Sequence, residues 1–148
     1  MLNIYNILMQ GLYIMAKSKS YIPKALIVDD NYNFREGYRE YLTYQTDLDI
    51  VGEAQDGFEA IKKINKLKPD IVFMDISMPK MDGLTAAHLI KKKFPEIKIV
   101  IVTIHEKYIF KGIVDSLPVD GFINKSAISH ELPKMLKKLD KYSNTIVE

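Results

Sequence analysis

The reactive side chains of this sequence gather directly after short apolar runs that are predicted to be β-strands. Two carboxylates follow the first run, one follows the third, a hydroxyl closes the fourth and an ammonium group follows the fifth: Asp29 and Asp30, Asp75, Thr103, and Lys125. In an open α/β sheet, ligands bind outside the carboxyl ends of the strands. One Asp after a strand is common in turns and helix caps, but four such strand ends together predict a shared site.

Three neighbouring carboxylates repel one another unless a cation compensates their charge. Hard oxygen ligands of this kind suit Mg²⁺, which often also binds a phosphate oxygen. One aspartate could then act as a nucleophile toward phosphorus, while a lysine supplies a point charge and a threonine a hydrogen bond to the phosphoryl oxygens. The predicted chemistry is the Mg²⁺-dependent formation of an aspartyl phosphate.

The elements that must position these residues alternate between short β-branched runs and longer segments of helical periodicity, which is typical of βα units around a parallel sheet. The first, third and fourth strands are continuous apolar runs, as expected for central strands, whereas Gly52 and Glu53 interrupt the second and indicate an edge strand. The expected strands are residues 25–28, 50–54, 71–74, 97–103 and 121–124.

Five helices are expected between and after these strands. Apolar residues repeat at helical spacing in the first two, and Pro95 and Pro118 follow the next two. Pro133 is expected in the first turn of the last helix. The apolar faces are Phe34, Tyr38, Tyr41 and Leu42, then Phe58, Ile61, Ile64 and Leu67, and the remaining helices are expected at 84–94, 107–115 and 129–142. The order is (βα)5, which predicts an α/β protein.

One run of sequence carries a family resemblance: MDISMPKMDG at residues 74–83. Together with the acidic pair at 29–30, Thr103 and Lys125, it resembles the receiver domain of two-component response regulators over roughly residues 24–139. The resemblance implies a flavodoxin-like, doubly wound fold with a five-stranded parallel sheet in the order 2-1-3-4-5.

The resemblance also implies a role for each residue of the site. Asp75 would accept a phosphoryl group from a sensor histidine kinase or a histidine phosphotransfer protein. Asp29, Asp30, Asp75 and the backbone carbonyl of Ser77 would hold Mg²⁺, with Asp30 bound directly and Asp29 mostly through water. Lys125 would bridge the acidic cluster and the phosphoryl group.

The same resemblance implies a switch. Thr103 would move toward the phosphoryl group, and Phe122 matches the aromatic switch position, although an aromatic residue in a buried strand is more often plain core. The readout would be the face of the fourth helix, expected at 107–115, and the fifth strand. A homodimer could form through this face and the fifth helix.

Two positions depart from the common family pattern. Ser126 follows Lys125 where many receivers have proline, which resembles the receivers that precede LuxR-type helix-turn-helix domains and act in transcription regulation. Ile104 follows Thr103 where a small residue is common, so its side chain could shield the phosphoryl group from water and slow autodephosphorylation.

Composition limits the other function classes. The 148 residues carry a net charge of +2 and no Cys, which excludes thiolate metal sites and gives no indication of nucleic-acid binding by this chain itself. A length of one domain leaves two readings open, a stand-alone receiver or a DNA-binding regulator truncated to its receiver. Either is expected to be a cytoplasmic signalling switch with self-catalysed phosphotransfer and slow autodephosphorylation rather than a turnover enzyme.

Two alternative functions remain open. A Mg²⁺-dependent phosphohydrolase could use Asp75 as its nucleophile, as haloacid-dehalogenase-like phosphatases do, but Ser77 stands where their general acid is expected. A receiver-like binding module that works without phosphorylation is the other alternative, although the complete set of site residues argues against it.

The first fifteen residues differ from the rest, with eleven apolar residues and no charge. A secretory signal would need a positive region before the apolar run, and a membrane span would need roughly 20 residues. Asn3, Asn6 and Gln10 form a polar stripe on a helix, which predicts either an amphipathic docking helix or sequence upstream of a native start at Met15. The expected organisation is a leader at 1–20, the receiver domain at 21–142 and a short tail at 143–148.

Overall fold

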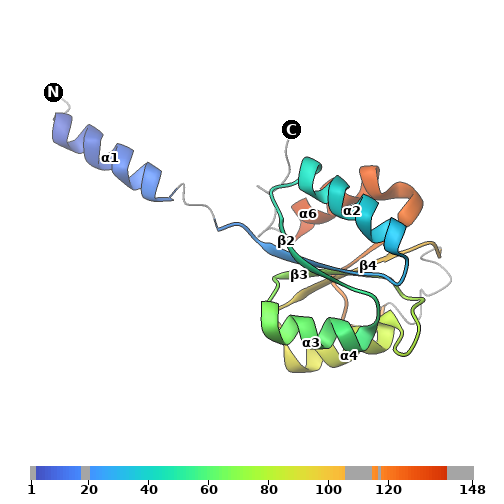
Figure 1. The fold of residues 1–148 in the computed structure, drawn as a ribbon. Helices are drawn as coiled ribbons and strands as arrows, with labels where there is room; N and C mark the ends of the chain where they lie inside the picture. Colours follow the sequence, from blue (N-terminus) through green and yellow to red (C-terminus); the bar gives the residue numbers. More distant parts are fainter. Residues whose placement is uncertain (1–2, 18–20, 106–114, 117, 140–148) are drawn as a thin grey trace.

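A five-stranded parallel sheet with helices on both faces forms the body of the protein, shown by a computed structural model (Figure 1). The structure describes residues 3–17, 21–105, 115–116 and 118–139. The sheet order is β2-β1-β3-β4-β5, which confirms the predicted order and the edge position of the second strand. The strands are β1 (Lys24–Val28), β2 (Asp49–Ala54), β3 (Ile71–Met74), β4 (Lys98–Thr103) and β5 (Gly121–Asn124).

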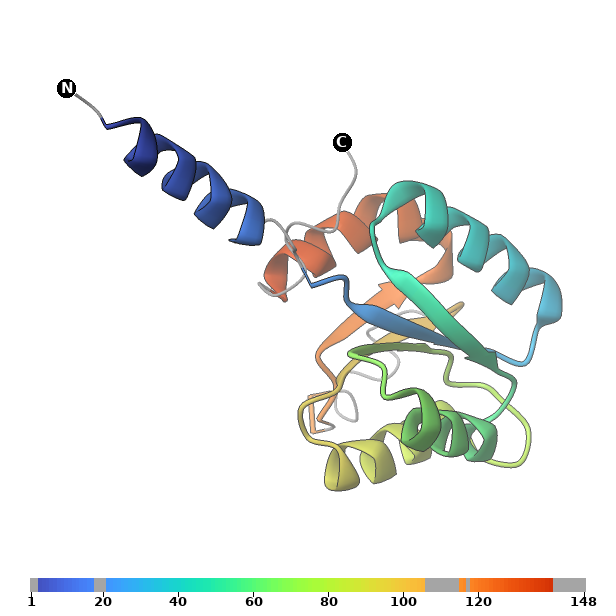
Figure 2. The same cartoon turned by 60° about the vertical axis from the view of Figure 1, so that its left-hand side comes forward.

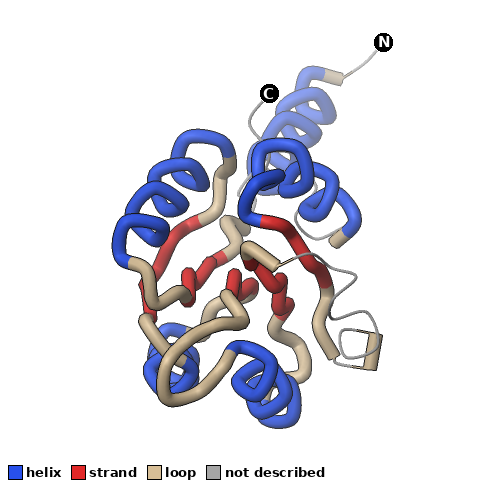
Figure 3. The backbone as a smooth tube through the Cα atoms, turned by 90° about the vertical axis from the view of Figure 1, so that its right-hand side faces the viewer, coloured by secondary structure: helices blue, strands red, loops and turns tan. Residues whose placement is uncertain are grey.

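Among the described residues, helices lie on both faces of the sheet (Figure 3). Helices α2 (Tyr32–Gln45) and α6 (Ile128–Lys138) cover one face, and α3 (Gly57–Leu67) and α4 (Gly83–Lys93) cover the other (Figure 1). Because successive strand residues point to opposite faces, the core divides into two clusters. Leu26 and Val28 belong to the cluster beneath α3 and α4, and Ala25 and Ile27 to the cluster beneath α2 and α6.

Three polar residues fix where the helices begin after the strands. The side chains of Asn31, Asp56 and Asp82 accept backbone N–H groups in the first turns of α2, α3 and α4. Such caps satisfy donors that have no partner within the helix. The chain therefore leaves each strand and enters the next helix through a short loop, which keeps the residues at the strand ends close to the sheet.

Two details of the helices differ from the sequence prediction. Phe58 is 58% exposed, because α3 turns its smaller residues, Ala60 among them, toward the core together with Ile64. Pro133 lies in the second turn of α6 because this helix begins at Ile128. The helix expected at 107–115 lies outside the described residues, apart from position 115.

The predicted N-terminal helix is present as α1 (Ile4–Lys17) and extends away from the sheet (Figures 1 and 2). Its apolar side chains are exposed, including Ile4 at 74%, Leu8 at 60% and Leu12 at 59%. Within the part of the chain that the structure describes, α1 and the other helices are too short or too polar to cross a membrane.

Candidate functional site

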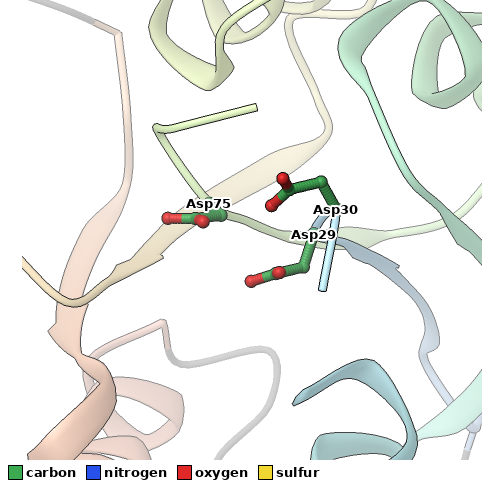
Figure 4. A group of neighbouring side chains, drawn as sticks. All are labelled: Asp29, Asp30 and Asp75. Atoms are coloured by element: carbon green, nitrogen blue, oxygen red, sulfur yellow. The ribbon is translucent and has the colours of Figure 1, made fainter. Parts of the chain in front are cut away.

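Three aspartates converge at the carboxyl edge of the two central strands (Figure 4). Asp29 and Asp30 follow β1 and Asp75 follows β3, and these strands are paired in parallel with Val28 opposite Met74. One carboxylate oxygen from each aspartate lies within 4.8 Å of the others. Asp29 and Asp75 are buried while Asp30 is exposed, so the cluster is reached from one side.

The backbone holds Asp29 firmly in this position. Its N–H donates to the carbonyl of Ala54 on β2 over 3.0 Å, and its Oδ1 accepts the N–H of Asn31 over 2.8 Å. The guanidinium of Arg35, from the first turn of α2, donates to the Asp29 carbonyl over 2.7 Å. Asp29 is therefore fixed between two neighbouring elements and has little freedom to turn out of the site.

Asp75 is fixed by its own loop and by α4. Its N–H donates to the carbonyl of Val28 over 2.9 Å, and its Oδ1 accepts the N–H of Ile76 over 2.8 Å. The start of α4 approaches so closely that a Cβ added to Gly83 would lie 1.8 Å from the Asp75 carbonyl oxygen. Gly83 is thus needed for a close backbone approach.

Lys125 brings the only cation found in ion-pair contact with these carboxylates among the described residues. Its Nζ lies 2.5 Å from Asp29 Oδ2 and 3.3 Å from Asp75 Oδ2. The same Nζ lies 4.0 Å from the ring centre of Phe34 on α2, in a cation–π arrangement. Lys125 therefore joins the end of β5 to both acidic loops.

The charges of the site suit a divalent cation. Burial raises the pKa of Asp29, although Lys125 and the Asn31 N–H oppose this effect and the charge of Asp75 adds to it. The buried Oδ2 of Asp29 lies in the ion pair with Lys125 and makes no further hydrogen bond within the described part of the chain. Three carboxylates facing one ammonium group fit a hard cation with oxygen ligands, such as Mg²⁺.

Thr103 and Phe122 lie on one face of the sheet. Thr103 ends β4 fully buried, and its Oγ1 accepts the N–H of His105 over 3.4 Å. Ile101 is paired with Phe122 on β5, and residues two apart in a strand share a face. Phe122 is 9% exposed and packs in the core cluster beneath α3 and α4. Thr103 and Phe122 therefore point toward the same side of the sheet.

The loops after β3 and β4 meet above the site. The hydroxyl of Ser77 lies 3.1 Å from Nε2 of His105, so the two loops are linked directly. Ile104 is 70% exposed, at the rim rather than in the core. The assignment of the Ser77 carbonyl as a metal ligand stays a prediction.

Two residues that support the site were missed by sequence reasoning. The sequence pattern places Phe34 only on the apolar face of its helix, yet its ring also faces the ammonium group of Lys125. Arg35 was not singled out, and it links the Asp29 carbonyl to Glu53 on β2. Their closeness in sequence to Asp30 is the one signal that could have indicated them.

Comparison with known proteins identifies the family. The family model of the response regulator receiver domain matches residues 25–137. The chain is 36% identical over 126 residues to the response regulator protein VraR of Staphylococcus saprophyticus, which covers 84% of this chain and 58% of that protein. The chain thus spans little more than half the length of this relative.

Solved structures share the fold. A LuxR-family two-component response regulator from Aurantimonas sp. SI85-9A1 has a TM-score of 0.74 and 27% identity, with 86% of this chain and 90% of that chain covered. The isolated REC domain of RcsB from Salmonella enterica serovar Typhimurium, solved with the phosphomimetic BeF3⁻, has a TM-score of 0.73 and 30% identity, with 82% and 90% covered. The chain is similar to receivers of LuxR-family regulators, and it belongs to the receiver domain family of two-component response regulators.

Proposed function

We propose that this chain is a phosphorylation-activated switch in which Asp75 accepts a phosphoryl group from a sensor histidine kinase or a histidine phosphotransfer protein. The observation that carries this proposal is the position of the Asp75 carboxylate, which shares the acidic cluster and lies 3.3 Å from Lys125 Nζ. A carboxylate so placed has a neighbouring positive charge for the phosphoryl oxygens.

The proposed transfer is a displacement at phosphorus. An oxygen of Asp75 forms the new bond to phosphorus while the bond from phosphorus to the donor imidazole breaks, and the electron pair of that bond stays on the imidazole nitrogen. The Ile76 N–H keeps Asp75 oriented through Oδ1. Lys125 compensates negative charge as the phosphoryl group arrives.

Asp29, Asp30, Asp75 and the Ser77 carbonyl are the residues that we propose hold Mg²⁺. The bound ion would supply compensation for the negative charge of the phosphoryl oxygens. Burial and the backbone bonds of Asp29 keep one ligand fixed, while the exposed Asp30 leaves room for water and phosphate.

The proposed switch links phosphorylation to the β4–β5 side of the molecule. Thr103 would turn its hydroxyl toward the new phosphoryl group, and Phe122, on the same sheet face, would move into the space that opens. The changed surface would include β5 and the helix expected at 107–115. Through this face and α6 we propose control of a partner, of an output domain or of a second copy.

The longer relatives indicate which cellular process this switch would control. RcsB was solved as two dimers bound to two parallel DNAs, and the chain covers 61% of that protein chain. We infer a cytoplasmic role in transcription regulation in which this segment provides the phosphorylation switch and does not itself bind nucleic acid, in keeping with its net charge of +2.

Beryllofluoride with Mg²⁺ tests this assignment without a kinase. With both present, the wild-type chain is expected to gain more thermal stability than with Mg²⁺ alone, because a ligand that binds the folded state raises its stability. Asp75→Asn should remove the gain, whereas Asp47→Asn, at an exposed position beyond α2, should keep it. An equal gain in Asp75→Asn would contradict the proposed role of Asp75.

A further inference from the structure

A continuous apolar seam runs between α2 and α6 on one face of the protein. A pocket of about 380 Å³ and a second of about 300 Å³ lie along it, and both are lined by Tyr41 and Ser129. Phe34 and Ile128 line the first, and Leu132 and Leu136 line the second. Of all the residues that line these two pockets, only Lys125 is charged. The seam therefore fits an uncharged, apolar occupant.

A buried polar group lies in the wall of the larger pocket. Tyr38 lines the larger pocket and is 3% exposed, yet its hydroxyl has no hydrogen-bond partner within the described part of the chain. Burial keeps the pKa of Tyr38 well above its usual value, so this hydroxyl stays protonated and can donate. Buried polar groups are normally hydrogen-bonded, so this hydroxyl is a donor that an occupant of the larger pocket could satisfy.

Helix α1 has the matching chemistry. Ile4, Leu8 and Leu12 are four residues apart and line one face of the helix, and all three are exposed. No residue before Lys17 is charged. Tyr5 supplies an uncharged polar group beside that face, whereas Asn6 and Gln10 lie on the opposite side of the helix. A helix with such a surface normally buries it against another element.

Length and attachment also match the seam. Helices α1 and α2 each have 14 residues, or about 21 Å. Six residues connect Lys17 to Lys24. The last of them, Pro23, accepts the N–H of Asp49 over 2.9 Å, only three residues after Thr46, which lines the seam. This connecting segment, which we call the tether, thus ends beside the end of α2, where β1 begins (Figure 2).

We propose that α1 folds back and docks its Ile4–Leu8–Leu12 face into the seam between α2 and α6 of the same chain. The extended position seen here is the undocked arrangement. A short tether gives the helix a high effective concentration near its own seam, which favours docking within one chain over exchange between copies. Because Lys125 and Phe34 line the larger pocket, a docked α1 would lie beside the candidate phosphorylation site.

Cysteine crosslinking tests the docking directly, since the chain has no native Cys. Met9→Cys in α1 is combined either with Ser129→Cys at the seam or with Lys62→Cys, at an exposed position of α3 on the opposite sheet face. A short bismaleimide should crosslink 9 to 129 within single chains, with a yield that tenfold dilution leaves unchanged. The 9 to 62 pair should give little product.

A matched pair of charge substitutions separates docking from chance collisions. Leu8→Asp places a charge on the docking face and should lower the 9 to 129 yield by about tenfold, while Asn6→Asp adds the same charge on the polar stripe and should keep it.

Four results would overturn the proposal: equal yields at 129 and 62, products only between copies, no effect of Leu8→Asp, or association of α1 with phosphatidylglycerol vesicles and no crosslink in solution. None of these readouts depends on phosphorylation, so the docking and the proposed function can fail separately.

Discussion

The fold buries the Asp29 carboxylate beside two other carboxylates, and this position changes its pKa. Burial raises this pKa, and Lys125 and the Asn31 N–H only partly oppose the effect. A carboxyl group whose pKa is higher in the folded state stabilises the fold below its unfolded value, about 3.9, and loses that contribution as the pH rises through the folded value. The ionised Asp29 therefore lowers the free energy of unfolding of the metal-free protein at pH 7.

The first prediction follows from this sign. Asp29→Asn should raise the free energy of unfolding of the metal-free protein at pH 7, and the difference from wild type should shrink toward pH 3, where both side chains are neutral. Urea unfolding at the two pH values measures it. Asp47→Asn, at an exposed site, serves as the control. A loss of stability at pH 7 in Asp29→Asn would show that the ion pair with Lys125 outweighs burial.

The second prediction concerns Ile104 at the rim of the site. Because its side chain is 70% exposed, Ile104→Ala should change folding stability by less than about 0.5 kcal/mol. We expect the same change to speed loss of the phosphoryl group from Asp75 by opening a path for water. The lifetime of the phosphorylated protein in Mg²⁺ measures this, with Leu89→Ala, at another exposed apolar residue, as control. Equal lifetimes would exclude a shielding role.

At the scale of elements, α4 can begin close to the loop after β3 because Gly83 has no side chain. A Cβ on Gly83 would lie 1.8 Å from the carbonyl oxygen of Asp75, so Gly83→Ala must push α4 away from the β3 loop. We predict a loss of about 1–3 kcal/mol of stability and weaker binding of beryllofluoride. Gly37→Ala is the matched control, because nothing lies within 4 Å of its added Cβ and a helical Ala should gain roughly 0.5–1 kcal/mol. Equal effects of the two changes on stability would contradict this account of α4.

The contact between β2 and α2 gives a prediction of opposite pH sign. Burial raises the pKa of Glu53, but the hydrogen bonds and charges of Arg39 and Arg35 outweigh it, so the pKa is lowered overall. Such a group stabilises the fold above its unfolded pKa, about 4.3, and loses that contribution as the pH falls through the lower folded value. Glu53→Gln should therefore cost roughly 0.5–1 kcal/mol at pH 7 and much less at pH 2.

Denaturant unfolding at the two pH values measures this difference. Glu40→Gln, at an exposed position of α2, should show neither the cost nor its pH dependence. A deficit in Glu53→Gln that persists at pH 2 would mean that packing, not charge, holds β2 to α2.

The elements differed in how well the sequence predicted them. The central strands β1, β3 and β4 were predictable because strands buried on both faces are continuous apolar runs. The buried side of α3 was not, since Gly57 and Ala60 face the core while the larger Phe58 is exposed. A hydrophobic pattern records residue size and polarity, whereas the closeness of Met81 to Gly57 depends on the fold.

At the scale of the whole molecule, the sheet order explains the assembly of the site. Parallel pairing of β1 with β3 and of β4 with β5 brings the ends of distant segments to one edge. The acidic cluster and Lys125 could be predicted because strand ends share an edge in this topology. Phe34 and Arg35 could not, because their contacts depend on how α2 packs beside that edge.

The phosphoacceptor role of Asp75 is the central claim, and acetyl phosphate with Mg²⁺ tests it most directly. Intact-mass measurement of the wild-type chain should show the gain of one phosphoryl group, mapped to the peptide that contains Asp75, with no gain when Mg²⁺ is chelated or in Asp75→Asn. Equal labelling of Asp75→Asn, or rapid turnover of ordinary phosphomonoesters by the wild-type chain, would contradict the account.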